Sequence, residues 1–377
     1  MTDTGVTEAD RHHMRAALAL AARGLGNTWP NPAVGCVLVR DGLVVGRGWT
    51  QPGGRPHAET EALARAGARA QGATAYVTLE PCNHHGQTPP CSEALIAAGI
   101  RRVVVACQDP DPRVAGGGVR RLTEAGIEVA TGLCEAEALA LNQGFFSRIQ
   151  HARPLYTLKL ATTLDGRIAT RAGASQWITG PVARAWGHGL RARHDAIMIG
   201  IGTALADNPE LTCRLPGLEQ RSPVRIVVDS RLRLPLTSRL AATARSIPTW
   251  IVTVEGGESA RLQAFADCGA EIITVPSDPA GLPNLDAASA ELAGRGLTRV
   301  LVEGGATLAA SLLRAGLVDR LEWFRAATVI GGDGTPAVAG FGLDGLDQMP
   351  GFERVAVRMA GPDLAESYIR HGTALNS

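Results

Sequence analysis

The chain has 377 residues, of which 45% are hydrophobic and 19% are charged. This composition predicts a globular protein with sizeable cores, and the length exceeds that of a typical single domain and indicates two. The 37 basic and 36 acidic side chains nearly cancel. The chain therefore has no excess positive charge with which to hold a polyanion, and nucleic acid is not an expected partner.

The N-terminal region carries no sign of export or membrane insertion. Its apolar run over residues 16–22 is too short to span a bilayer, and the polar, mixed-charge residues before it lack the layout of a signal peptide. The seven cysteines are odd in number and scattered, so they do not indicate a disulfide framework. We expect a cytoplasmic protein with no membrane partner.

Residues 1–147 predict one α/β domain, because strands and helices alternate along them. Apolar residues at helical spacing predict a helix over residues 10–24, and Asp41-Gly42 predicts the turn of a β-hairpin. The expected strands are residues 34–39, 43–46, 75–79, 102–106 and 128–131, and the further expected helices are 59–70, 92–98 and 120–125.

A set of potential metal ligands surrounds the start of the helix expected over residues 59–70. His57-Ala58-Glu59 stands there, and Cys82 and Cys91 flank a long insertion after the next strand. One imidazole and two thiols can hold zinc by three corners of a tetrahedron, which leaves the fourth for water. The carboxylate of Glu59 can then move that water's protons without binding the metal, as in the zinc deaminases.

A structural zinc site is the alternative interpretation. Such a site is usually closed by four protein ligands, and His84 or His85 could supply the fourth. The position of Glu59, two residues after His57, favours a catalytic site. Asn31 precedes Pro32, and by itself this pair indicates only a turn. The histidines outside the cluster, His188 among them, are expected to be solvated or structural.

Residues 148–154 are polar and end in proline, so we expect a linker there and a second α/β domain over residues 155–377. Its expected strands are residues 155–160, 196–201, 224–228, 250–254, 271–275 and 299–302. No GxGxxG follows a first strand, which disfavours a Rossmann domain. Gly304-Gly305 instead precedes a helix, whose first N–H groups could bind a pyrophosphate.

Three blocks of sequence resemble one family over nearly the whole chain. Two of them lie in the first half of the chain and read Thr28-Trp-Pro-Asn-Pro-Ala-Val-Gly-Cys36 and Thr78-Leu-Glu-Pro-Cys-Asn-His-His-Gly-Gln-Thr-Pro-Pro-Cys91. The third block is the second half of the chain. They are similar to the bifunctional riboflavin-biosynthesis proteins, which fuse a pyrimidine deaminase to a pyrimidine reductase. The resemblance implies an N-terminal cytidine-deaminase-like α/β/α domain and a C-terminal dihydrofolate-reductase-like α/β domain.

The same resemblance implies two activities and assigns residues to them. A phosphoribosylaminopyrimidine would lose its ring amine by zinc-dependent hydrolysis, and NADPH would then reduce the ribosyl side chain. Asn31 would read the pyrimidine edge. The implied cofactor contacts are Ala161, Trp177, Thr203, Asp207, Ser230, Gly305, Ala306, Thr307, Leu308, Ala309, Ala310 and Ser311. The implied substrate contacts in the second domain are Ser175, Arg191, Leu211, Arg214 and Glu303.

Two details extend this reading. Arg191 and Arg214 are the candidates for binding the substrate's phosphate, because a guanidinium group can donate two parallel hydrogen bonds to phosphate oxygens. Ser230, beside Arg231 and Arg233, is the candidate for the extra phosphate of NADPH. Taken without the resemblance, the preferred interpretation is that Arg191 and Arg214 are surface charges and that Trp177 is a core residue.

Two other classes of function compete with this interpretation. A nucleic-acid-editing deaminase is disfavoured by the near-neutral charge and by an aromatic content of only 4%. A non-catalytic zinc-stabilised binding module is disfavoured by the position of Glu59 and by the reductase-like second half. The sequence does not determine the oligomeric state, and both a monomer and a homo-oligomer are compatible with it.

Overall fold

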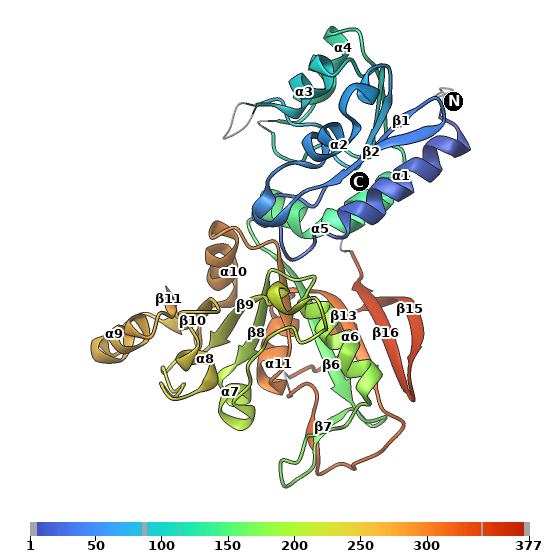
Figure 1. Ribbon diagram of the computed structural model, residues 1–377. Helices are drawn as coiled ribbons and strands as arrows, with labels where there is room; N and C mark the ends of the chain where they lie inside the picture. Colours follow the sequence, from blue (N-terminus) through green and yellow to red (C-terminus); the bar gives the residue numbers. More distant parts are fainter. Residues whose placement is uncertain (1–5, 85–88, 113, 341, 373–377) are drawn as a thin grey trace. The chain divides into compact units, whose positions relative to one another are not determined.

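The computed structural model describes residues 6–84, 89–112, 114–340 and 342–372. These residues divide into two compact units, the first ending at His151 and the second beginning at Ala152. Figure 1 shows the first unit in blue to green and the second in green to red. Within the described ranges, every helix is too short or too polar to cross a membrane.

The first unit is built on a five-stranded sheet with the strand order β2-β1-β3-β4-β5. Strand β1 pairs antiparallel with β2 and β3, whereas β3, β4 and β5 run parallel. Its elements in chain order are α1 (Glu8–Ala21), β1 (Gly35–Arg40), β2 (Leu43–Trp49), α2 (Ala58–Ala66), β3 (Thr74–Val77), α3 (Cys91–Ala97), β4 (Arg102–Val105), α4 (Gly117–Glu124), β5 (Glu128–Thr131) and α5 (Glu135–His151).

Small residues let helices approach both faces of this sheet. A Cβ on Gly35 would lie 1.9 Å from the Ala17 carbonyl oxygen of α1, and one on Gly48 would lie 2.1 Å from the Ala58 carbonyl oxygen of α2. Gly48 pairs with Cys36, the neighbour of Gly35. Because successive strand residues point to opposite faces, α1 and α2 lie on opposite sides of the sheet, and the unit is an α/β/α sandwich.

Several helix boundaries differ from the sequence expectation. Helix α1 begins at Glu8, because Thr7 and Asp10 form a capping box that the prediction missed. Helix α2 ends at Ala66 and not at residue 70, since Gly67 has a φ of 55°. Residues 148–151, expected in the linker, form the last turn of α5, a helix that the sequence analysis did not assign.

The second unit is built on a nine-stranded sheet with the order β11-β10-β9-β8-β12-β6-β13-β16-β15. A small second sheet pairs β7 with β14. The strands are β6 (Leu155–Thr162), β7 (Arg167–Ala169), β8 (Ala196–Gly200), β9 (Val224–Val228), β10 (Thr249–Val254), β11 (Glu271–Val275), β12 (Arg299–Val302), β13 (Val318–Arg325), β14 (Thr335–Pro336), β15 (Phe352–Ala360) and β16 (Asp363–Arg370). The α-helices are α6 (Pro181–Arg191), α7 (Ile201–Asp207), α8 (Arg239–Ala242), α9 (Ser259–Asp267), α10 (Leu285–Gly294) and α11 (Ala306–Arg314).

The strands of the large sheet fall into a parallel part and an antiparallel part. The seven strands from β11 to β13 run parallel, and the central ones are buried and mostly apolar, as parallel strands usually are. Strands β13, β16 and β15 pair antiparallel. The sequence analysis did not assign these three, because apolar and charged residues are mixed along them and no continuous apolar run marks them.

The contact between Gly48 and α2 can be tested by adding one methyl group. Gly48→Ala should lower the free energy of unfolding of the first unit by about 1–3 kcal/mol, because the new Cβ would press on helix backbone that cannot move aside easily. Hydrogen exchange of the β1 and β2 amides in urea would measure it. Gly117→Ala is the control, since its Cβ would come no closer than 3.9 Å to Asn83. Equal stability of Gly48→Ala and the wild type would contradict the close contact.

Candidate active sites

The start of α2 places an imidazole and a carboxylate together in the first unit. His57 is the residue that precedes α2 at its N-cap, and Glu59 lies in the first helical turn. The side chain of Glu59 is buried. Since Gly46 and Gly48 let α2 lie directly on strand β2, the close packing of the sandwich fixes the position of both side chains.

Two thiols approach the imidazole from the other side. Cys82 follows β3, and Cys91 is the first residue of α3. The backbone N–H of Cys91 donates a hydrogen bond to Cys82 Sγ over 3.3 Å. An N–H group at a helix N-terminus stabilises negative charge, so this contact favours the thiolate form that a metal requires.

The three side chains fit a tetrahedral zinc ion. Nδ1 of His57 lies 3.3 Å from Sγ of Cys91 and 3.7 Å from Sγ of Cys82. A tetrahedral ion with its usual bond lengths to nitrogen and sulfur would set these ligand atoms about 3.6 Å apart. The observed distances bracket that value, so little movement is needed to bind the ion.

The number of ligands separates a catalytic site from a structural one. In the part of the chain that the structure describes, His57, Cys82 and Cys91 form the cluster without a fourth histidine, cysteine or carboxylate. His84 lines the neighbouring cavity and does not join the cluster. His85, the other candidate for a fourth ligand, lies outside the described residues. Three ligands are what a zinc ion that also holds water requires.

Burial and neighbouring groups shift the pKa values of Glu59 and of the two cysteines. Burial, together with the nearby Cys82, raises the pKa of Glu59 to about 7. Hydrogen bonds from Cys91 lower the pKa of the Cys82 thiol to about 4, whereas the same thiol–thiol contact and burial raise the pKa of Cys91. A carboxyl group with a pKa near neutrality can both accept and donate a proton, as a general acid–base catalyst must.

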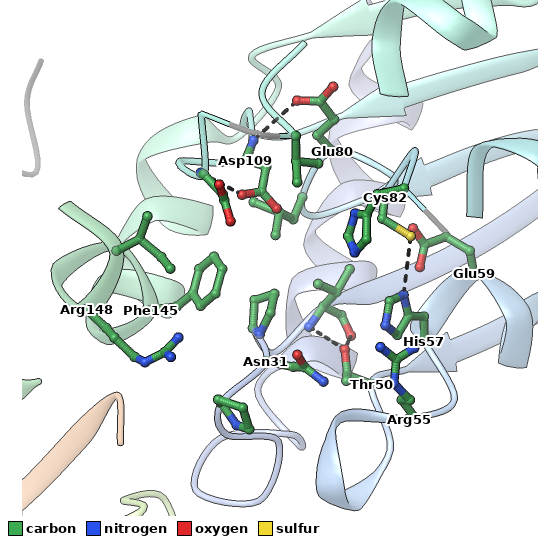
Figure 2. Close-up of a pocket in the computed structure, with 18 residues that line it drawn as sticks. Asn31, Thr50, Arg55, His57, Glu59, Glu80, Cys82, Asp109, Phe145 and Arg148 are labelled. Carbon is green, nitrogen blue, oxygen red and sulfur yellow. Dashed lines mark hydrogen bonds between the residues drawn. The ribbon is translucent and has the colours of Figure 1, made fainter. Parts of the chain in front are cut away.

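A cavity opens beside the cluster, and Asn31 lines it together with His57, Glu59 and Cys82. Figure 2 shows His57, Glu59 and Cys82 on one side of this cavity and Phe145 and Arg148 of α5 on the opposite side. The Asn31 amide nitrogen donates to the Gly54 carbonyl oxygen over 3.2 Å. Arg55, Asp109, Asp111 and Arg148 also line the cavity, and the sequence analysis assigned none of them.

The second unit has one cavity lined by most of the expected substrate contacts. It lies beside β6 and at the end of β12, and the carboxyl ends of parallel strands are where ligands bind in α/β sheets. Its expected lining residues are Ala161, Ser175, Trp177, Arg191, Asp207, Arg214 and Glu303. Trp177 is 65% exposed and is not a core residue. The Arg184 guanidinium lies 4.6 Å from the centre of the Trp177 ring.

An ion pair that is largely shielded from solvent lines this cavity. Nε and one terminal nitrogen of Arg191 donate to the two carboxylate oxygens of Glu303 over 2.7 and 2.9 Å, and its other terminal nitrogen donates to the Thr212 carbonyl oxygen. Lys159 Nζ lies 3.9 Å from Glu303. Burial alone would raise the pKa of Glu303, but Arg191 and Lys159 outweigh it and lower the pKa to about 2. Glu303 is therefore ionised throughout the physiological range.

A second cavity in this unit is lined by several of the other expected cofactor contacts. It lies beside Gly200 at the end of β8 and the start of α11, and its expected lining residues are Ser230, Gly305, Thr307, Leu308 and Ser311. Arg233 lines it as well, whereas Arg231 does not. Thr203 lies next to the glycine pair, since a Cβ on Gly305 would be 3.3 Å from its hydroxyl oxygen.

Several residues stand differently from the sequence expectation. The side chains of Leu211, Ala309 and Ala310 are buried, and Leu211 belongs to a hydrophobic core cluster. Ala306 begins α11 at the glycine pair. His188, which the sequence analysis placed outside the metal-ligand cluster, lines the substrate cavity. Lys159 was missed, although a lysine within the otherwise apolar strand β6 is a signal that sequence reasoning could have used.

Known family models match both halves of the chain. The cytidine and deoxycytidylate deaminase zinc-binding region matches residues 7–107, and the RibD C-terminal domain matches residues 154–365. The riboflavin biosynthesis protein RibD of Escherichia coli (strain K12) is 44% identical over 368 residues, which cover 94% of this chain and 98% of the relative. The RibD protein of Bacillus amyloliquefaciens is 40% identical over 356 residues, covering 94% and 95%.

Solved structures agree with these matches. Acinetobacter baumannii RibD (form 1) is 38% identical and has a TM-score of 0.86. The match covers 96% of this chain and 99% of the Acinetobacter chain. The diaminohydroxyphosphoribosylaminopyrimidine deaminase/5-amino-6-(5-phosphoribosylamino)uracil reductase of Thermotoga maritima is 33% identical with a TM-score of 0.83 over the same shares.

The expected fold of each domain and the expected cofactors are confirmed. The first unit is a deaminase domain whose His/Cys/Cys cluster fits zinc, and the second is a reductase domain of the NADPH-dependent type. The chain therefore belongs to the RibD family of bifunctional riboflavin biosynthesis enzymes, in which a zinc-dependent deaminase domain precedes an NADPH-dependent reductase domain.

Proposed function

We propose that the two units act in turn on one small molecule. The first removes the ring-position-2 amine of 2,5-diamino-6-(5-phosphoribosylamino)pyrimidin-4(3H)-one by hydrolysis and releases ammonia. The second reduces the ribosyl side chain of that product to give 5-amino-6-(5-phosphoribitylamino)uracil. The observation that carries the proposal is the buried Glu59 beside a three-ligand cluster, in a chain whose second half holds a separate reductase cavity. The name of the Thermotoga maritima relative states the same two activities.

In the deaminase site we assign proton transfer to Glu59. Zinc held by His57, Cys82 and Cys91 supplies a Lewis acid that makes a water molecule easier to deprotonate. Glu59 accepts the proton of the attacking water and returns it to the departing amine nitrogen. Asn31 faces the same cavity and pairs with the polar edge of the pyrimidine. Arg55 and Arg148, which also line the cavity, bring positive charge for the phosphate.

In the reductase unit we assign the two cavities to different ligands. NADPH supplies the hydride when it is bound. The proposed cofactor contacts are Ala161, Trp177, Thr203, Asp207, Ser230 and residues 305–311, and the proposed substrate contacts are Ser175, Arg191, Leu211, Arg214 and Glu303. Lys159 joins the substrate group because it borders the cavity beside Glu303. Positioning C1′ of the sugar against the nicotinamide accounts for much of the catalysis.

We further propose that each activity resides in its own part of the chain, with the deaminase ending with α5 at His151 and the reductase following it. Each part has its own sheet and its own cavities, which supports this division. All seven cysteines are free thiols, and this supports a reducing compartment such as the cytoplasm.

Loss of one thiol ligand should remove the metal. Cys82→Ser is expected to bind far less than one zinc per chain and to release no ammonia, because serine is a poor ligand for zinc at neutral pH. Metal analysis together with an ammonia assay would measure both. The reductase turnover of the same variant is the internal control and should not change. Full zinc content with intact deamination would remove Cys82 from the site.

Removal of the proton carrier should spare the metal. Glu59→Gln keeps the size of the side chain but cannot accept a proton, so ammonia release should fall by about 10²-fold or more while zinc content stays at one per chain. Steady-state assays with the small pyrimidine would measure this fall. In the same assays the wild type should release no ammonia from single-stranded DNA or RNA, which tests the competing interpretation as a nucleic-acid-editing deaminase. Ammonia release near the wild-type rate in Glu59→Gln would exclude the role of Glu59.

Arg233 should select NADPH over NADH. Its guanidinium group borders the cofactor cavity with Ser230, and a charge-assisted bond to the extra phosphate is worth about 1.5–3 kcal/mol. Arg233→Ala should therefore raise the KM for NADPH by about 10-fold or more and leave the KM for NADH unchanged. Arg231→Ala is the matched control, since Arg231 does not border the cavity. An unaltered KM for NADPH in Arg233→Ala would contradict this assignment.

A further inference from the structure

A second buried glutamate, Glu80, lies two residues before the zinc ligand Cys82, and its carboxylate is fully engaged by backbone. Oε1 accepts hydrogen bonds from the N–H groups of Gly118 and Val119 over 2.9 and 3.1 Å. Oε2 accepts from Gly116 over 2.9 Å and more weakly from Asp109 over 3.4 Å. The carboxylate therefore sits on the N-terminus of α4, where the free N–H groups and the helix dipole both favour a negative charge.

Helix α4 reaches this carboxylate because residue 118 is glycine. A Cβ at Gly118 would lie 1.9 Å from the Pro81 carbonyl oxygen, so any side chain there would push the helix away from the Glu80-Pro81 peptide. The backbone N–H of Glu80 also donates to the Cys107 carbonyl oxygen over 3.0 Å. The residue is thus tied by its backbone to the end of β4 and by its side chain to α4.

The chain after Cys82 is held separately, at the start of α3. The N–H of Ser92 donates to the Cys82 carbonyl oxygen over 3.1 Å, and the Ser92 hydroxyl donates to Asn83 Oδ1 over 2.8 Å. Eight residues separate Cys82 from Cys91, so one short turn cannot fix both thiols as it does when two residues separate them. The position of Cys82 depends on one anchor before it and one after it.

We infer that Glu80 is a positioning residue that holds Cys82 in place for zinc. It acts through the peptide chain and not by touching the metal, since Glu80 is absent from the ligand cluster and Figure 2 shows its carboxylate directed away from Cys82. Four N–H groups donate to this carboxylate. The NH₂ group of an amide in its place would face these donors and find no acceptor, so the position requires a carboxylate. The inference rests on the proposed zinc-dependent deamination for its consequence in catalysis, but its consequence for zinc affinity is independent.

Glu80→Gln in the full-length chain tests the inference. The amide keeps one acceptor oxygen and turns an NH₂ group toward N–H donors, so α4 should shift and loosen Cys82. Zinc affinity, measured by competition with a chelator, should fall by about 10–100-fold, the usual effect of residues that orient metal ligands. In the cobalt-substituted protein the sulfur-to-cobalt absorption should change. The kcat for ammonia release should fall more than the KM rises, and reductase turnover should be unchanged.

Glu93→Gln is the matched control. Glu93 on α3 pairs with Arg121 on α4 over 2.6 and 3.1 Å, so this change also removes a carboxylate contact of α4 but leaves the Glu80 contacts intact. Zinc affinity and the cobalt spectrum should stay at wild-type values. An equal loss of zinc affinity in Glu93→Gln would show that any weakened contact of α4 has this effect, and it would overturn the inference.

Two further results decide the remaining cases. Wild-type zinc affinity and an unchanged cobalt spectrum in Glu80→Gln would overturn the positioning role. If that variant does not fold, Glu80→Asp, which keeps the charge but is one methylene shorter, must show the same weaker zinc binding. Failure of the wild type to release ammonia despite binding zinc would instead contradict the proposed function and leave the effect of Glu80 on zinc affinity to be judged by itself.

Discussion

A carboxylate that leaves water must find compensation in the protein, and Glu59, Glu80 and Glu303 find it in three different ways. Glu303 is compensated by Arg191 and Lys159, so it remains ionised. Glu80 is compensated by backbone N–H groups of α4. Glu59 has less compensation, and its pKa rises to about 7. The partners around each carboxylate therefore distinguish an ionised partner of two cations, a carboxylate anchored by backbone, and the residue that we propose as the proton carrier.

The parts of the fold that could be predicted from sequence are those with a strong local signal. The parallel strands β8, β9 and β12 are short, mostly apolar segments, and the sequence analysis located their ends within one residue. The antiparallel strands β13, β15 and β16 mix charged and apolar side chains, so their pairing depends on distant partners. The same limit applies to α5, whose inward face contributes Phe145 and Arg148 to the deaminase cavity.

The candidate sites divide along the same line. His57, Glu59, Cys82 and Cys91 could be found because zinc chemistry demands few residue types at defined spacings. Asp109, Arg148 and His188 could not be found this way, since they reach their cavities only through the packing of helices and loops far apart in the sequence. The ligand contacts that the resemblance implies between residues 203 and 311 include Leu211, Ala309 and Ala310, whose side chains are buried. Such residues can meet a ligand only through their backbone.

The geometry of the two arginines in the reductase cavity refines how the substrate's phosphate would be held. All three nitrogens of Arg191 already donate hydrogen bonds, two groups to Glu303 and one to the Thr212 carbonyl oxygen. Arg191 can therefore bind a phosphate only with its remaining N–H groups, while it keeps Glu303 ionised and oriented. Arg214 has a side chain that is 54% exposed and a looser 3.6 Å pairing with Glu210. Because a loosely paired guanidinium group costs less to redirect, we propose Arg214 as the main ligand of the substrate's phosphate and assign Arg191 chiefly to holding Glu303 in place.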